Sequence, residues 1–184
     1  MTSPLQSSQL QSILSEFNEA DGRVESLGKM DSSKLSKPPS TGGWSAIQCI
    51  DHLNTTSRFF IPLLTKAIQE AKALLQKTGT YRLDVFGLLL VKTLSSRKSY
   101  TKSKTPPSFV PSPALDVAAT LQEFRALQSQ LEQLLSESDG LAIDKVKVRS
   151  AFNAKITYSA YSAFRILIVH EFRHLDQAQA ALVS

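Results

Sequence analysis

The segment VHEFRHLDQ at residues 169–177 contains His170, Glu171 and His174 in the pattern H-E-x-x-H. On an α-helix, residues four apart project from one face about one turn from each other, so both imidazoles can reach one metal ion. Apolar residues continue at helical spacing around the motif: Phe164, Leu167, Ile168, Phe172 and Leu175. The stretch therefore predicts a long helix that carries a candidate metal site.

A zinc-protease helix is one interpretation of this motif. Such proteases take a third metal ligand from residues downstream of the helix. The segment LDQAQAALVS that follows His174 holds no His or Glu, and Asp176 lies too close in sequence to fit those patterns. The third ligand is therefore expected upstream, where His52 is the one remaining histidine of the chain.

His52 lies in a segment with a clear helix start. In GGWSAIQC, Ser45 and Gln48 form the S-x-x-Q capping box, with Trp44 and Cys49 at the hydrophobic-staple positions on either side. A helix is expected to begin directly after the capping serine. His52 then lies about two turns into it, where a bundle can bring it against the last helix.

The spacing of apolar residues predicts four long helices. They are expected at residues 5–28, 46–76, 115–138 and from about 157 to near the end of the chain. Pro62 lies inside the second of them and is expected to kink it, because proline removes a backbone donor and crowds the preceding turn.

The connections contain shorter predicted elements. Residues 81–95 are apolar and predicted to be helical, residues 96–114 form a basic loop rich in Ser, Lys and Pro, and residues 141–150 alternate weakly, as in a short extended segment. Thr157 is the expected N-cap of the last helix. Four long helices with one long crossover between the second and third predict an all-α four-helix bundle, in a single domain spanning residues 1–184.

The net charge of +5 is concentrated in one segment. Between Asp84 and Asp116 there is no acidic residue, and five basic ones occur there: Lys92, Arg97, Lys98, Lys102 and Lys104. Clustered basic residues attract phosphate, RNA or an acidic thiol cofactor. Without interleaved aromatic residues or a nucleic-acid motif, a solvated loop at residues 92–104 is the better prediction, and no specific nucleic-acid partner is expected.

The sequence predicts a cytoplasmic protein that does not bind a membrane. The longest apolar runs, at 86–91 and 166–169, are far shorter than the roughly 20 residues that a membrane-spanning helix needs. The polar start MTSPLQSSQLQS lacks the apolar core of a signal peptide. The one cysteine, Cys49, fits a reducing compartment and is expected to be a small core residue, not a metal ligand.

Two signatures together resemble the DinB/YfiT superfamily of metal-binding four-helix bundles. That family has a Trp-Ser start to its second helix with a histidine soon after, and H-x-x-x-H-x-x-Q on its last helix. WSAIQCIDHL at residues 44–53 matches the first signature with Trp44, Ser45 and His52. HEFRHLDQ at residues 170–177 matches the second. The resemblance covers nearly the whole chain.

The resemblance implies a divalent metal ion, often zinc or nickel, held by His52, His170 and His174 with open positions for water or substrate. Three protein ligands with an open position are typical of a catalytic zinc site, whereas structural sites are closed. A small-molecule substrate and a homodimer are also expected. Three imidazoles with ordinary hydrogen bonds are the alternative that needs no metal.

Three neighbours of the histidines have predicted roles. Asp51 and Gln177 are candidates to accept the proton of the imidazole nitrogen that faces away from the metal, because metal-bound histidines usually donate that proton. Glu171 lies near His174 on the helix wheel and is a candidate general base, or a group that orients a ligand. The alternative for Glu171 is a solvated glutamate paired with a basic residue.

These observations predict a metal-dependent enzyme in which the metal activates water or a small thiol, for hydrolysis or for thiol S-transfer. The resemblance implies both reaction classes and, for the second, a low-molecular-weight thiol as cofactor. The alternative is a non-catalytic module, in which the metal joins two helices and the protein serves as a binding or stress-response partner.

Overall fold

The helix that carries His52, α3 (Ala46–Lys72), begins at the predicted capping box. The Ser45 side chain accepts a hydrogen bond from the Gln48 backbone N–H at 3.4 Å, and the Ser45 N–H donates to the Gln48 side chain at 3.0 Å. These bonds satisfy backbone donors that a helix start otherwise leaves unpaired. Pro62 lies inside the helix, as predicted.

The computed structural model describes residues 5–77, 79–95, 105–151, 153 and 155–183. Within this part of the chain, four long helices form a bundle: α1 (Ser8–Leu27), α3, α5 (Val117–Glu137) and α6 (Ala160–Ala181). The predicted all-α four-helix bundle is therefore confirmed.

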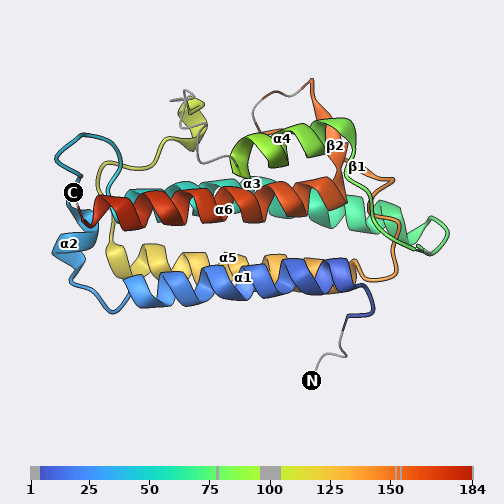
Figure 1. Ribbon diagram of the computed structural model, residues 1–184, viewed down its shortest axis with the longest axis horizontal. Coiled ribbons are helices and arrows are strands. Elements are labelled where there is room, and N and C mark those ends of the chain that lie inside the picture. The colour runs from blue at the N-terminus through green and yellow to red at the C-terminus, as the bar shows by residue number, and fades with distance from the viewer. Residues whose placement is uncertain (1–4, 78, 96–104, 152, 154, 184) are drawn as a thin grey trace.

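Each helix of the bundle packs against two neighbours. α3 contacts α5 and α6, and α1 contacts the same two helices. α5 and α6 therefore face each other diagonally across the bundle. In Figure 1, α3 and α6 form the upper layer, and α1 and α5 form the lower one. The colours show that α3 and α5 run in the same direction, which requires the long crossover predicted between them.

The core consists of the apolar faces that the four helices turn toward one another. Phe17 of α1, Phe60 of α3, Phe124 of α5 and Phe164 of α6 are each at most 2% exposed. Burying one such side chain contributes roughly 1.5–3 kcal/mol relative to leaving it in water. Apolar burial at helical spacing is therefore the main interaction that holds the bundle together.

The connections contain short elements. A short helix, α2 (Ser32–Ser36), lies between α1 and α3. The crossover between α3 and α5 contains the predicted helix, α4 (Val85–Ser95), which packs on α6, and a 3-10 turn, η1 (Pro107–Phe109). Residues 96–104 of the predicted basic loop lie outside the described residues. Among the described helices, none is long and apolar enough to cross a membrane.

A two-stranded antiparallel sheet precedes α6, formed by β1 (Lys147–Arg149) and β2 (Thr157–Ser159). β1 lies in the segment that was predicted to be extended. Thr157 pairs with Arg149 in this sheet, so the prediction that Thr157 caps α6 is wrong. The cap is Ser159, whose side chain accepts a hydrogen bond from the Ser162 N–H at 3.1 Å. Strand pairing extends as far as Ser159, and the helix can begin only after it.

Asp84 and Gly87 fix α4 against the start of α6. Asp84 Oδ1 accepts a hydrogen bond from the Gly87 N–H at 2.9 Å, and Oδ2 accepts one from the Ser159 N–H at 2.6 Å. A Cβ at position 87 would overlap the Ser162 side chain and lie 2.9 Å from Asp84 Oδ1. The close approach of the two helices therefore requires glycine at position 87.

Replacing Gly87 by alanine is expected to destabilise the fold by roughly 1–3 kcal/mol, because the added methyl group overpacks the α4–α6 contact. Gly22 is a matched control, since it lies in α1 and a Cβ there meets no atom within 4 Å. Gly22→Ala should be neutral or stabilising by roughly 0.5–1 kcal/mol, because alanine is the better helix former. Urea unfolding measures both; equal effects of the two substitutions would contradict the close approach.

Candidate metal centre

The fold brings all three histidines of the chain together. His52 projects from α3, whereas His170 and His174 project from adjacent turns of α6. Their candidate ligand nitrogens all lie within 4.8 Å of one another. His52 and His170 are 5% and 6% exposed, and His174 is half-buried. In the described part of the chain, no other group of three His, Cys, Asp or Glu side chains is close enough to hold a metal ion.

The spacing of the rings and the outer hydrogen bonds of two of them fit a metal, whereas His170 Nδ1 is buried without a hydrogen-bond partner among the described residues. His52 Nδ1 lies 2.7 Å from the Phe109 carbonyl oxygen, and His174 Nδ1 lies 3.0 Å from Gln177 Oε1. A proton on each Nδ1 satisfies these acceptors and leaves the lone pair on Nε2. The Nε2 atoms of His52 and His170 are 3.2 Å apart. Two imidazole nitrogens on one tetrahedral zinc ion would be roughly 3.3 Å apart, so the spacing suits two ligands of one ion.

Burial keeps the three imidazoles neutral. It lowers the pKa of His52, although the Phe109 carbonyl and the Asp51 carboxylate oppose the shift. Burial and the neighbouring imidazoles lower the pKa of His170 well below its ordinary value. Burial and the His52 imidazole lower the pKa of His174 to about 3. Because metal ions bind the neutral imidazole, these rings are in the binding form at neutral pH.

Two aromatic residues pack against the histidine cluster. The Trp44 ring centroid lies 4.9 Å from that of His52 and 5.9 Å from that of His174. The Phe109 ring centroid lies 6.5 Å from that of His52. Trp44 therefore contacts the site in addition to its position at the helix start. The sequence did not indicate a role for Phe109, because this residue lies in an irregular segment without periodic apolar residues.

Asp51 does not contact the outer nitrogen of His52, contrary to its predicted role. The Phe109 carbonyl lies against that nitrogen instead. Asp51 Oδ2 accepts a hydrogen bond from the Ser112 N–H at 3.0 Å, and the Gln48 side chain donates to the Ser112 carbonyl at 3.2 Å. Both contacts attach the segment after η1 to α3. Asp51 therefore positions the segment that carries Phe109. Gln177, by contrast, lies against His174 as expected.

Glu171 lies in the bundle interior and not in the histidine cluster. It follows His170 by one residue, a rotation of about 100° around the helix. Its side chain is 1% exposed, and Oε2 accepts a hydrogen bond from Gln128 of α5 at 2.9 Å. These contacts do not support the predicted general base, and the burial rules out the alternative of a solvated glutamate.

Burial raises the pKa of Glu171 to about 8, and the nearby carboxyl groups of Asp21 and Glu132 add to the shift, although the Gln128 hydrogen bond opposes it. Burial also raises the pKa values of Asp21 and Glu132. The interior between α1, α5 and α6 therefore favours protonated carboxyl groups. Since the Glu171 carboxyl is not part of the histidine cluster, its protonation can be tested separately from metal binding.

Glu171→Gln is expected to stabilise the protein increasingly as the pH rises from about 4.5 to 8. The folded carboxyl keeps its proton in this window, whereas the unfolded one loses it, so the wild-type protein loses stability as the pH rises, by at most roughly 1.4 kcal/mol per pH unit. The glutamine can still accept the Gln128 hydrogen bond. Urea unfolding at pH 5, 6, 7 and 8 measures the difference.

The matched control for Glu171→Gln is Glu19→Gln, which changes an exposed residue of α1. Its effect on the free energy of unfolding should be small, because the side chain is exposed. A pH-independent effect of Glu171→Gln would contradict the buried placement of this carboxyl. Loss of turnover with metal still bound would restore the general-base role instead.

The comparisons with known proteins agree with this geometry. The family model of the DinB superfamily matches residues 17–178. A solved structure with a similar fold is YfiT from Bacillus subtilis, described as a probable metal-dependent hydrolase with an unusual four-helix bundle topology. Its TM-score is 0.59 at 14% identity, over 97% of this chain and 90% of that one. A search of curated proteins found no match. The chain belongs to the DinB superfamily.

Proposed function

We propose that this protein is a divalent-metal-dependent hydrolase whose metal is held by His52, His170 and His174. The observation that carries the proposal is the convergence of three neutral imidazoles from two helices, with candidate ligand nitrogens within 4.8 Å of one another. A site with three protein ligands leaves a position open, which is typical of catalytic zinc. The description of YfiT as a probable metal-dependent hydrolase supports the same reaction class.

The bound ion would lower the pKa of a water molecule and so supply a nucleophile at neutral pH. The chain itself holds the ligands in place. The Phe109 carbonyl and the Gln177 side chain fix the proton on the outer nitrogens of His52 and His174. Trp44 limits the access of water on the side that it covers. Imidazole ligands suit both zinc and nickel, so we propose one of these two ions.

Thiol S-transfer is the second reaction that such a centre supports, because a divalent ion activates a thiol as it activates water. The chain's own Cys49 does not supply that thiol. It is buried, it is not part of the histidine cluster, and burial raises its pKa to about 12. S-transfer would therefore use a separate low-molecular-weight thiol as cofactor.

The expected partners are a small-molecule substrate and a second copy of the chain, with no specific nucleic acid and no membrane. The homodimer has candidate contact residues in α4, whose side chains include exposed apolar ones: Val85, Phe86, Leu88 and Leu89. A cytoplasmic location, the dimer and the absence of nucleic-acid and membrane partners stay predictions.

His52→Ala and His170→Ala should each remove the metal, because neither helix provides three ligands by itself. Gln177→Ala should weaken metal binding by roughly 10–100-fold, since it removes an outer hydrogen bond of a ligand. Gln122→Ala, at an exposed glutamine of α5, is the matched control and should keep the metal. Elemental mass spectrometry after dialysis gives the ions per chain. Full retention of metal in either histidine variant would contradict the ligand set.

Activity of the zinc- or nickel-loaded protein distinguishes the reaction classes. We expect hydrolysis of an activated ester such as p-nitrophenyl acetate without added thiol, and a fall to background on chelation and in His170→Ala. Turnover of a halogenated aromatic electrophile only with added cysteine would instead indicate S-transfer. No turnover of either kind, with metal bound and with unfolding shifted to higher temperature by the ion, would favour the non-catalytic module.

A further inference from the structure

A pocket of about 400 Å³ lies beside the histidine cluster. Phe109, whose carbonyl oxygen contacts His52 Nδ1, forms part of its wall. Thr55 and Phe59 line it from α3, one and two turns after His52. Phe109 therefore lies between the pocket and the outer nitrogen of His52.

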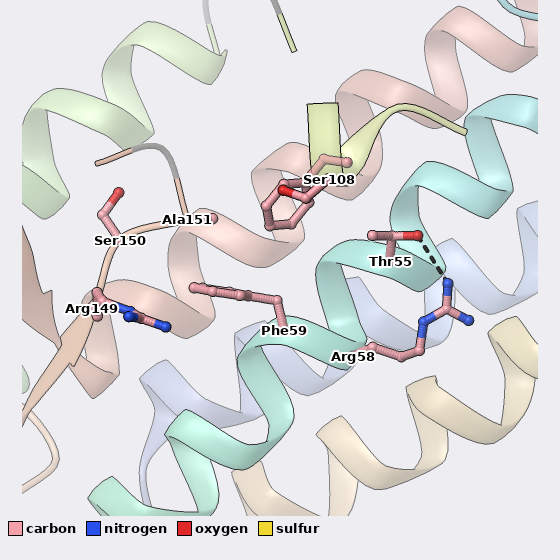
Figure 2. Close-up of a pocket in the computed structure, with 8 residues that line it drawn as sticks. Thr55, Arg58, Phe59, Ser108, Arg149, Ser150 and Ala151 are labelled. Atoms are coloured by element: carbon pink, nitrogen blue, oxygen red, sulfur yellow. Dashed lines mark hydrogen bonds between the residues drawn. The ribbon is translucent and has the colours of Figure 1, made fainter. Parts of the chain in front are cut away.

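The lining of this pocket carries positive charge. Arg58 and Arg149 both line it, and its lining includes no Asp or Glu. Arg58 is already neutralised, because it forms an ion pair with Glu123 and donates a hydrogen bond to Thr55 at 2.9 Å. Figure 2 shows Arg58 and Thr55 on one side of Phe59, and Arg149 on the other.

Arg149 has a different environment. It ends β1, and its guanidinium carbon lies 5.6 Å from the centroid of the Phe59 ring. None of the ion pairs between described residues includes Arg149. The ring orients the guanidinium through a cation–π contact and leaves its N–H groups available. The planar fork of arginine binds carboxylate and phosphate through two parallel hydrogen bonds.

We propose that this pocket binds an acidic group of the substrate, a carboxylate or a phosphate on an apolar body, with Arg149 as its anchor. The rings of Phe59 and Phe109, with centroids 5.6 Å apart, would contact the apolar body. The inference rests on the proposed function, because it treats the histidine cluster as the place where the substrate reacts.

The groups beside and within this pocket follow one another from His52 to Arg149. From the His52 ring, the next centroid is that of Phe109 at 6.5 Å, and then that of Phe59 at 5.6 Å. Arg149 follows, 5.6 Å from the Phe59 centroid. Arg149 selects the substrate in this account and takes no part in the bond that breaks.

The test compares three probes of similar size: 4-phenylbutyrate, its neutral amide, and 2-phenylethyl phosphate. Titrations follow the backbone N–H signals of Thr55, Ser108 and Ala151 by NMR. We expect one or both acids to bind at least ~10-fold more tightly than the amide, as charge-assisted hydrogen bonds predict. The tighter acid identifies carboxylate or phosphate as the natural group. Equal affinities for all three probes would overturn the inference.

Arg149→Gln should abolish the preference for the acid and leave the affinity of the amide unchanged, whereas Arg149→Lys should keep part of the preference. The matched control is Arg82→Gln, at an exposed arginine that does not line the pocket. This control should behave as the wild type. A full preference in Arg149→Gln would overturn the assignment of the anchor.

The same titrations with metal-loaded and metal-free protein separate this inference from the proposed function. The preference should be equal in both, because Arg149 is not a ligand. A preference that requires the ion would mean that the acid binds the metal, and would overturn the inference. If the protein binds no metal but prefers the acid, the proposed function fails and the anion pocket stands.

Discussion

The packing of α3 against α6 is the contact on which the candidate site depends. α6 supplies two imidazoles four residues apart, and α3 supplies the third, so the set exists only where the two helices meet in register. His52 Nε2 reaches 3.2 Å from His170 Nε2 in this register. A rotation of either helix by one residue, about 100°, would turn its imidazoles away from the cluster. The capping box of α3 and the strand that ends at Ser159 set where the two helices begin.

The crossover segment joins the metal centre to the neighbouring pocket. Asp51 and Gln48 hold Ser112 on α3, and this anchors the segment that begins at η1. Phe109 in η1 then has two roles, since its carbonyl faces His52 while its side chain lines the pocket. Residues of α3 thus position both the carbonyl group beside His52 and the wall of the neighbouring pocket. These hydrogen bonds explain why the segment from η1 to Ser112, which has no periodic apolar residues, has a fixed place in the fold.

Local signals in the sequence were sufficient for the helices, whereas the grouping of His52 with His170 and His174 came from the resemblance to the DinB/YfiT superfamily. The capping box at Ser45 and the apolar periods specify elements whose residues are neighbours along the chain. The roles that required tertiary contacts were harder to predict. Asp51 and Glu171 both lie next to a histidine in sequence, yet a rotation of about 100° per residue directs one to Ser112 and the other to Gln128. Thr157 has the residue type of a cap, but strand pairing with Arg149 takes precedence there. No sequence motif indicated Phe109 or Arg149, because their positions depend on how the crossover and the hairpin pack on α3.

X-ray absorption spectroscopy of the zinc- or nickel-loaded protein is the sharpest test of the three-histidine centre, since it counts the imidazoles around the ion. We expect three imidazole ligands, with nitrogen at roughly 2.0–2.1 Å for zinc, completed by light oxygen or nitrogen scatterers and without sulfur. A shell with fewer than two imidazoles, or one with a sulfur ligand at about 2.3 Å, would contradict a centre built from His52, His170 and His174.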